Sequence, residues 1–170
     1  MINRQLRSWV FMLYPDNDKH LNAINYIDLL DNSLYIKHIA KFDENNELIN
    51  KEHYHCILKF DSPTWLSSII KDLNLSDDDA HLFHSYKDFK GKNSKPRYKS
   101  LDEYINYLDH METNKPDKYV IDDFKGGLVS LAQRIINNRE TEKYLSFYTN
   151  YQKIIFHNHY RYKLYTSLQM

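Results

Sequence analysis

The 170-residue sequence has little cysteine and glycine, and it has no excess of charge of either sign. Its single cysteine, Cys56, excludes a disulfide within the chain, because that bond needs a second thiol. Lysine plus arginine and aspartate plus glutamate both number 23, so no net charge draws the whole chain to nucleic acid or to a membrane. Any basic binding site must therefore be local.

The sequence also lacks a long apolar run. It has no stretch of about 18 consecutive apolar residues, the length that spans a membrane, and no signal-peptide pattern. We therefore expect a soluble, cytoplasmic protein with no membrane partner. Hydrophobic residues make up 42% of the chain, which is enough apolar material for the core of one globular domain.

Apolar periodicity predicts alternating strands and helices in the first two thirds of the chain. Alternating or β-branched stretches predict strands at 6–14, 33–42, 53–60 and 80–89. Helical spacing predicts helices at 19–32, 63–73 and 101–111, the second of them opened by Ser62 and Pro63. The order strand, helix, strand, strand, helix, strand is that of a ferredoxin-like split βαβ domain, an α+β fold with an antiparallel sheet and helices on one side.

The composition changes after Gly126 and Gly127, where long helical patterns begin. We predict a first domain at 1–125 and a helical C-terminal extension at 126–170. The extension carries more aromatic surface than a solvated helix needs, including Tyr144, Phe147 and Tyr148. We expect it to pack on the first domain or on another subunit, which makes a homo-oligomer one candidate assembly.

The stretch EHYHCIL places His53 and His55 on one face of a predicted strand. Two imidazoles about 7 Å apart along a strand can converge on one divalent metal. Asp43, at the far end of the neighbouring predicted strand, is a candidate third ligand. Such a set suits Mn²⁺ or Mg²⁺ acting on a phosphate oxygen better than a closed structural zinc site. The alternative is two ordinary polar residues at the start of a strand.

The predicted helix at 101–111 offers a nucleophile. Leu101, Ile105 and Leu108 form its apolar stripe, and Tyr107 lies about 110° from the centre of that stripe, where it can face a ligand. In a chain with 15 tyrosines it is equally typical of a surface side chain. His110, three residues further on, either assists Tyr107 or is a solvated histidine favoured by the helix dipole.

A basic loop precedes this helix. Its aromatic side chains are Tyr86, Phe89 and Tyr98, and its one acid is Asp88. Its cations are Lys87, Lys90, Lys92, Lys95, Arg97 and Lys99. Cations for phosphates and rings for stacking are typical of a track for single-stranded nucleic acid, although a solvated loop has the same composition.

These motifs together resemble the single-tyrosine His-hydrophobe-His (HUH) endonuclease domain of rolling-circle replication initiators (Rep), most closely those of small plasmids of the pMV158 type. WVFMLYPDN resembles the family's opening strand, FDENNELINKEHYHCIL its metal strand and the loop before it, and YLDH its Tyr-Leu-x-His. The resemblance covers about residues 6–124. It implies that His53, His55 and Asp43 bind the metal and that Tyr107 is the nucleophile.

One position departs from the family pattern. The family commonly has a histidine three residues before the carboxylate ligand, where this chain has Ala40. His38 lies on the same predicted strand face as Ala40 and is a candidate substitute, with Glu47 or a water as alternatives. A weaker, drifted metal site is the remaining interpretation.

The resemblance implies a plasmid replication initiator that nicks and rejoins DNA. Its substrate would be single-stranded DNA extruded at an origin hairpin, and Tyr107 would form a 5′-phosphotyrosine and release a 3′-hydroxyl. The chain has no Walker-type loop, so a host helicase and polymerase would be its partners. An HUH transposase or relaxase, a non-catalytic DNA-binding module on the same fold, and a zinc-dependent hydrolase of a small molecule are the alternatives.

Overall fold

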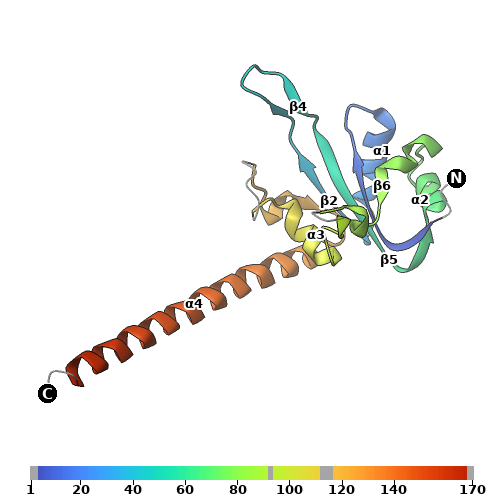
Figure 1. Ribbon diagram of the computed structural model, residues 1–170. Coiled ribbons are helices and arrows are strands. Elements are labelled where there is room, and N and C mark those ends of the chain that lie inside the picture. Colours follow the sequence, from blue (N-terminus) through green and yellow to red (C-terminus); the bar gives the residue numbers. More distant parts are fainter. Residues whose placement is uncertain (1–3, 92–93, 112–116, 168–170) are drawn as a thin grey trace. The chain divides into compact units, whose positions relative to one another are not determined.

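The computed structural model describes residues 4–91, 94–111 and 117–167, and of residues 154–167 it describes only the backbone. Two compact units make up the chain, Met1–Gln133 and Arg134–Met170. The elements in chain order (Figure 1) are β1 (Gln5–Leu13), α1 (Asp18–Ile27), β2 (Ser33–His38), β3 (Lys41–Phe42), β4 (Leu48–Asn50), β5 (His53–Trp65), α2 (Leu66–Asp72), the 3₁₀ helix η1 (Asp77–Leu82), β6 (Phe83–His84), the 3₁₀ helix η2 (Tyr86–Asp88), α3 (Leu101–Leu108), the 3₁₀ helix η4 (Ile121–Asp123), β7 (Phe124–Lys125) and α4 (Val129–Ser167).

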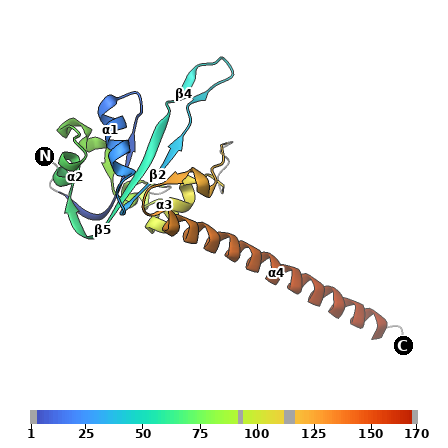
Figure 2. The same cartoon turned by 180° about the vertical axis from the view of Figure 1, so that it is seen from behind.

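The first unit is built on a five-stranded antiparallel sheet with the strand order β6-β1-β5-β2-β7. β5 is the central strand, and it pairs antiparallel with β1 on one side and with β2 on the other. β1 and β2 therefore run in the same direction with β5 between them. Figure 2 shows the same strands from behind. The prediction of an α+β fold with an antiparallel sheet and a C-terminal helix is confirmed.

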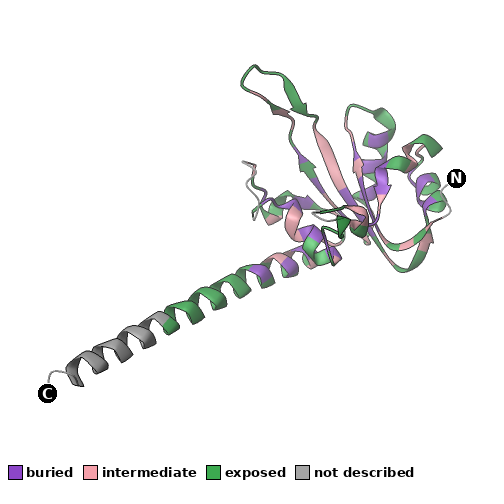
Figure 3. Cartoon of the chain, viewed as in Figure 1, coloured by how far each residue is buried: buried purple, intermediate pink, exposed green. Residues whose placement is uncertain are grey.

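One face of this sheet is covered by α1 and α2. Alternate residues of the strands point to this face, as the period of two requires. The buried apolar cluster that they form with the two helices comprises Trp9, Phe11, Leu13, Ala23, Ile24, Ile27, Cys56, Leu58, Leu66, Ile69, Ile70, Leu73, Leu82 and Phe83. Figure 3 shows buried positions on these strands and on the inner sides of the helices. This cluster is the main hydrophobic core.

The opposite face carries α3. Val10, Ile36 and Ile57 are buried on this side of the sheet. The hydroxyl of Tyr104 and the carbonyl of Leu108, both in α3, lie within hydrogen-bonding distance of side chains from this face. Helices therefore cover both faces, whereas the sequence predicted helices on one side only.

Local sequence explains where α1 begins. The start of α2 differs from the one that the sequence predicted. The side chain of Asn17 accepts hydrogen bonds from the backbone N–H groups of Lys19 and His20, so it caps α1. The prediction that Pro63 opens the second helix is wrong, because β5 continues through Pro63 to Trp65. An irregularity in the pairing with β1 accommodates the proline within the strand.

A two-stranded arm, β3 and β4, connects β2 to β5. The backbone N–H of Asp43 donates to the carbonyl of Glu47 at 2.9 Å, which closes the turn of the arm. β2 and β5 then pair along their length, from Ser33↔Leu58 to His38↔His53. β2 and β5 therefore form an antiparallel pair, and the connection between them is itself a short hairpin.

Gly126 and Gly127 mark a point of close packing before α4. Gly126 has φ +98°, and a Cβ atom on it would lie 2.6 Å from Oγ of Ser33. The N–H of Leu128 donates to the carbonyl of Ser33 at 2.8 Å. The division between the two compact units falls after Gln133, inside α4, rather than at the predicted 125/126 boundary.

α4 is one helix of 39 residues. Its described side chains from Glu140 onward are exposed. They include the aromatic residues Tyr144, Phe147, Tyr148 and Tyr151. Among the described residues, no helix combines the length and the apolar character that crossing a membrane requires.

Candidate metal centre

The pairing of β2 with β5 brings three histidines together. His38 lies opposite His53 in the ladder, and His55 is two residues further along β5. One ring nitrogen from each of the three lies within 4.8 Å of the others. We call His38, His53 and His55 the histidine triad. The structure therefore places His38, the candidate substitute for the family histidine, beside His53 and His55.

Hydrogen bonds to backbone carbonyls indicate which ring nitrogen of His53 and of His38 has a lone pair. Nδ1 of His53 is 2.7 Å from the carbonyl of Lys51, and Nε2 of His38 is 3.1 Å from the carbonyl of Leu108. A carbonyl only accepts hydrogen bonds, so these two nitrogens carry the protons. The lone pairs then lie on Nε2 of His53 and on Nδ1 of His38.

The spacing of the nitrogens fits a shared metal ion. Nε2 of His53 and Nε2 of His55 are 3.2 Å apart. Two nitrogens bound at about 2.1 Å to one metal, with an angle between 90° and 109°, are about 3.0–3.4 Å apart. Two lone pairs facing each other at this distance repel unless a metal ion or a proton lies between them. Three imidazoles with these lone pairs can therefore hold a divalent metal.

Tyr104 orients the third ring of the triad. Its hydroxyl lies 3.3 Å from Nδ1 of His55, where it can accept the N–H and leave Nε2 for the metal. Burial raises the pKa of Tyr104, so the hydroxyl stays protonated. Tyr104 was not among the residues that the sequence singled out on this helix. Its position one turn before Tyr107 was the available signal.

Asp43 is not part of this cluster. Its Oδ1 accepts hydrogen bonds from the N–H groups of Asn45 and Glu47, at 2.9 and 2.8 Å, within the turn of the arm. The prediction placed it near the triad because it assumed one continuous strand from residue 33 to residue 42. The chain instead leaves β2 at His38 and enters the arm. Glu47 lies in the same turn and is exposed.

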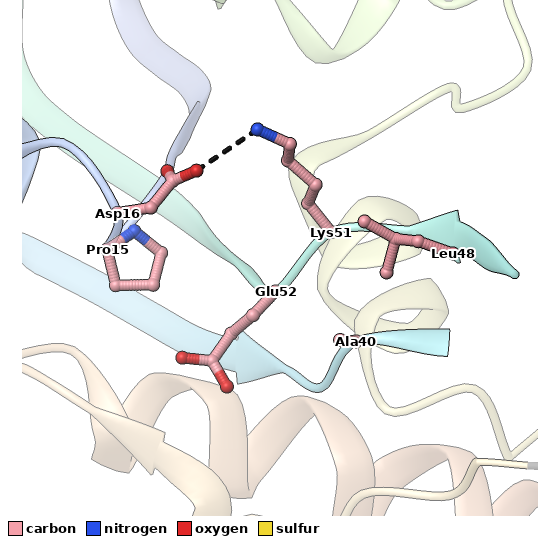
Figure 4. A pocket seen from close by; sticks show the side chains of 6 residues that line it. All are labelled: Pro15, Asp16, Ala40, Leu48, Lys51 and Glu52. Atoms are coloured by element: carbon pink, nitrogen blue, oxygen red, sulfur yellow. Dashed lines mark hydrogen bonds and ion pairs between the residues drawn. The ribbon is translucent and has the colours of Figure 1, made fainter. Parts of the chain in front are cut away.

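A pocket lies at the base of the arm, beside the residues that lead into the triad (Figure 4). Lys51 and Glu52, which immediately precede His53, form one wall of it together with Ala40. Nζ of Lys51 is 3.1 Å from Oδ2 of Asp16 across the pocket. The complete lining is Pro15, Asp16, Ala40, Leu48, Lys51 and Glu52.

His110 connects Tyr107 to the triad. The ring of His110 is centred 4.5 Å from that of His38 and 5.6 Å from that of Tyr107. His110 is 1% exposed, so the interpretation of a solvated histidine at the helix end is wrong. Its φ of +57° is a left-handed conformation that ends α3 and turns the ring back to the sheet. Tyr107 itself is half-buried.

Tyr119 covers the triad from the segment that follows α3. Its ring stacks on that of His38, with centroids 4.5 Å apart and an angle of 10° between the planes. Its hydroxyl accepts a hydrogen bond from the N–H of Ile39 at 3.3 Å. No sequence pattern singled out Tyr119, because it lies in an irregular segment whose path depends on tertiary contacts.

The basic loop folds back on itself beside α3. The N–H of Arg97 donates to the carbonyl of Phe89 at 2.7 Å, and the ring of Phe89 stacks on Tyr104. Tyr98 is 6% exposed. These two rings therefore anchor the loop to α3 instead of facing the solvent as predicted. The exposed cations are Lys87, Lys90, Lys95, Arg97 and Lys99, and the predicted Lys92 lies outside the described residues.

The acid of the loop is paired with a cation. Nη1 and Nη2 of Arg4 donate to the carboxylate of Asp88 at 2.5 and 2.9 Å. This hydrogen bonding lowers the pKa of Asp88 below its usual range. The pair ties the loop to the N-terminal segment and leaves the remaining described cations of the loop without an acid of the loop to neutralise them.

No model of a known protein family matches the sequence, and no match is found among curated proteins. The class of protein is therefore defined by the fold and the site alone. The chain is an α+β protein whose antiparallel sheet bears three clustered histidines beneath a helix that carries tyrosines.

Proposed function

We propose that the chain is a metal-dependent DNA endonuclease and strand transferase of the HUH class, acting as a plasmid rolling-circle replication initiator. In this proposal it nicks single-stranded DNA at an origin and rejoins it through a covalent bond to Tyr107. The observation that carries the proposal is the histidine triad beneath α3, with His110 between the triad and Tyr107. A metal centre beside a tyrosine is the pair of components that this chemistry needs.

The strand arrangement supports the ferredoxin-like form of this fold. Taken in chain order as first to fourth, the strands β1, β2, β5 and β6 lie in the spatial order fourth, first, third, second. Parallel β1 and β2 separated by antiparallel β5 form a split βαβ unit, with α1 as its crossover. The triad then occupies the face opposite α1 and α2.

His38, His53 and His55 would hold the metal ion. The proposed cofactor is Mn²⁺ or Mg²⁺, and three imidazoles favour Mn²⁺, since Mg²⁺ prefers oxygen ligands. A metal ion held by these residues would supply Lewis-acid polarisation of an oxygen of the scissile phosphate. In this scheme His38 takes the place of the family histidine that is absent at Ala40. The hydrogen bonds that the rings donate to the carbonyls of Lys51 and Leu108 and to the hydroxyl of Tyr104 keep the rings oriented.

Tyr107 would perform the displacement at phosphorus. Its phenolic oxygen attacks the phosphate and forms the tyrosine–phosphate bond, while the bond from phosphorus to the 3′ oxygen breaks. The phenolic proton passes to solvent, and the departing 3′ oxygen takes a proton from water. The product is a 5′-phosphotyrosine and a 3′-hydroxyl, and the reverse attack rejoins the strand.

The cations of the basic loop would bind the phosphates of the single strand. Lys87, Lys90, Lys95, Arg97 and Lys99 are exposed next to α3, where they supply charge without an excess in the chain as a whole. In the cytoplasm a host helicase would unwind the DNA, and a host polymerase would extend the 3′-hydroxyl. The exposed aromatic residues of α4 supply apolar surface for a homo-oligomer.

Two other functions use the same observations. An HUH transposase or relaxase would show the same adduct on a different DNA target. A non-catalytic DNA-binding module would bind through the basic loop and form no adduct. The covalent test below separates the second of these from the nuclease, and the sequence of the cleaved strand separates the first.

The test is the formation of a covalent protein–DNA band on a denaturing gel. Labelled single-stranded and hairpin oligonucleotides, tiled across the DNA that encodes the chain, are incubated with the protein and Mn²⁺. We expect an adduct that EDTA and Tyr107→Phe abolish. Tyr148→Phe, an exposed tyrosine of α4, is the matched control and should leave the adduct intact.

Binding of oligonucleotides without any adduct would refute the nuclease and favour the binding module. An adduct that persists in Tyr107→Phe would assign the nucleophile to another tyrosine. Peptide mapping of the adduct by mass spectrometry distinguishes this second outcome from background crosslinking.

A further inference from the structure

Arg97 lies directly over the proposed nucleophile. The Cζ atom of its guanidinium is 4.6 Å from the centroid of the Tyr107 ring and 5.5 Å from that of Tyr98. The backbone hydrogen bond from Arg97 to Phe89 holds the backbone of Arg97 in place beside α3. Lys87, by contrast, lies over the ring of Tyr86. Arg97 therefore does more than add one charge to the loop.

Tyr98 contacts the same nucleophile from a second direction. The rings of Tyr98 and Tyr107 are centred 5.3 Å apart, with an angle of 50° between their planes. Tyr98 is buried, with its ring edge-on to Tyr104. The ring of Tyr107 therefore has the guanidinium of Arg97 over its face and the ring of Tyr98 beside it.

We infer that Arg97 and Tyr98 are positioning residues that orient Tyr107 for attack, and that Arg97 also stabilises the negative charge that develops on it. This inference rests on the proposed function, since it needs Tyr107 to be the nucleophile. It separates Arg97 from the other loop cations, which would only bind the phosphate backbone.

The physical basis is the change in charge of the phenol during attack. As the proton leaves, negative charge spreads from the oxygen into the ring, and a cation over the ring face is attracted more strongly. Stacking uses the flat face of a guanidinium, so its edges still present N–H donors to phosphate oxygens. Arg97 can therefore hold the attacking ring and the scissile phosphate at the same time, which reduces the orientational freedom lost on reaching the transition state.

The experiment separates DNA affinity from the rate of the covalent step. Affinity for a labelled oligonucleotide that forms the adduct is measured by fluorescence anisotropy in EDTA. The rate constant of adduct formation is measured at saturating protein with Mn²⁺, in a single turnover. The variants are Arg97→Ala, Arg97→Lys, Tyr98→Leu and Lys99→Ala, and thermal unfolding confirms that each is folded.

We expect Arg97→Ala and Lys99→Ala to weaken DNA binding to a similar extent, because each removes one cation. The rate constant of Arg97→Ala should fall about tenfold or more below that of Lys99→Ala. Arg97→Lys should recover the affinity but only part of the rate, since an ammonium group does not stack as a plane. Tyr98→Leu should lower the rate and leave the affinity unchanged, because it removes the ring that lies against Tyr107.

The outcomes distinguish this inference from the proposed function. If the wild-type protein forms no adduct with any oligonucleotide, the proposed function fails and the inference fails with it. If the wild type forms the adduct, and Arg97→Ala matches Lys99→Ala in both affinity and rate, the inference alone is overturned.

Discussion

The two faces of β5 differ in what their side chains do. Cys56 and Leu58 point to the face covered by α1 and α2, where they are buried among apolar side chains. His53 and His55 point to the face covered by α3, where each ring nitrogen contacts a polar group or another histidine. One strand therefore supports both the hydrophobic core and the candidate site.

This separation has an energetic consequence. The core face gains its stability from the burial of aliphatic and aromatic carbon, at about 25 cal/mol per Å². The histidine face has oriented polar rings, whose hydrogen bonds contribute little net stability but determine geometry. Changes to the apolar side chains of the first face should unfold the protein, and changes to the histidines of the second should remove metal binding while the fold remains.

The largest expected effects come from a pair of alanine substitutions on opposite faces. His55→Ala should weaken Mn²⁺ binding about a hundredfold or more, because it removes one of three protein ligands. Leu58→Ala should leave Mn²⁺ affinity within about twofold at temperatures where it is folded, yet cost about 2–5 kcal/mol of stability. Isothermal titration calorimetry and urea denaturation measure the two quantities.

A result in which His55→Ala unfolds the protein as severely as Leu58→Ala would contradict the separation of the faces. His53→Ala provides a second variant of the same face, since its ring is half-buried and bonds to the backbone of Lys51.

Metal addition should stabilise the fold through the histidine face alone. An ion that binds only the folded state contributes about 2.7 kcal/mol at a concentration one hundred times its dissociation constant. The unfolding midpoint in urea should therefore rise when Mn²⁺ is added and return when EDTA is added. His53→Ala should not respond to either reagent, whereas Leu58→Ala should respond as the wild type does.

A smaller effect is expected when the hydroxyl that orients His55 is removed. Tyr104→Phe should lower Mn²⁺ affinity about tenfold, because the tautomer and direction of the His55 ring are less well fixed. Tyr35→Phe is the matched control, since its hydroxyl lies 2.7 Å from Oδ1 of Asp28 and away from the triad. Equal Mn²⁺ affinities for the two variants, measured by calorimetry, would show that Tyr104 has no part in the site.

The smallest effect concerns the Arg4–Asp88 pair, which belongs to neither face. The hydrogen bond from Arg4 lowers the pKa of Asp88, so the stabilisation is present above the unfolded carboxyl's pKa of about 3.9 and is lost as the pH falls through the lower native pKa. Asp88→Asn should remove this part of the acid dependence. Both side chains are about a third exposed, so we expect less than about 1 kcal/mol.

Urea denaturation between pH 2 and pH 6 measures this contribution. A stability curve for Asp88→Asn that runs parallel to that of the wild type over this range would contradict the assignment. Mn²⁺ affinity at neutral pH should be the same in both proteins.

The sequence predicted what depends on local periodicity. The alternation in EHYHCIL correctly placed His53 and His55 on one face of a strand. His38 entered as a candidate because it shares a strand face with Ala40. Its contact with the triad depends on the register of β2 against β5, which no local pattern determines.

The parts that the sequence did not predict depend on packing between distant segments. Tyr104 and Tyr119 reach the triad only because of where α3 and the following segment lie on the sheet. Asp43 was misplaced because the arm interrupts the strand after His38. Pro63 was taken as a helix start because the irregular pairing that admits it into β5 involves β1, about 57 residues earlier.

The most direct test of metal binding by the histidine triad is to locate the bound ion. Crystals grown with Mn²⁺ would be measured for anomalous scattering at the manganese absorption edge. If the histidine triad binds the ion, there will be one strong peak about 2.0–2.3 Å from a ring nitrogen of each of His38, His53 and His55. A peak bound instead at Asp43 in the arm, or no peak at the triad in crystals saturated with Mn²⁺, would contradict it.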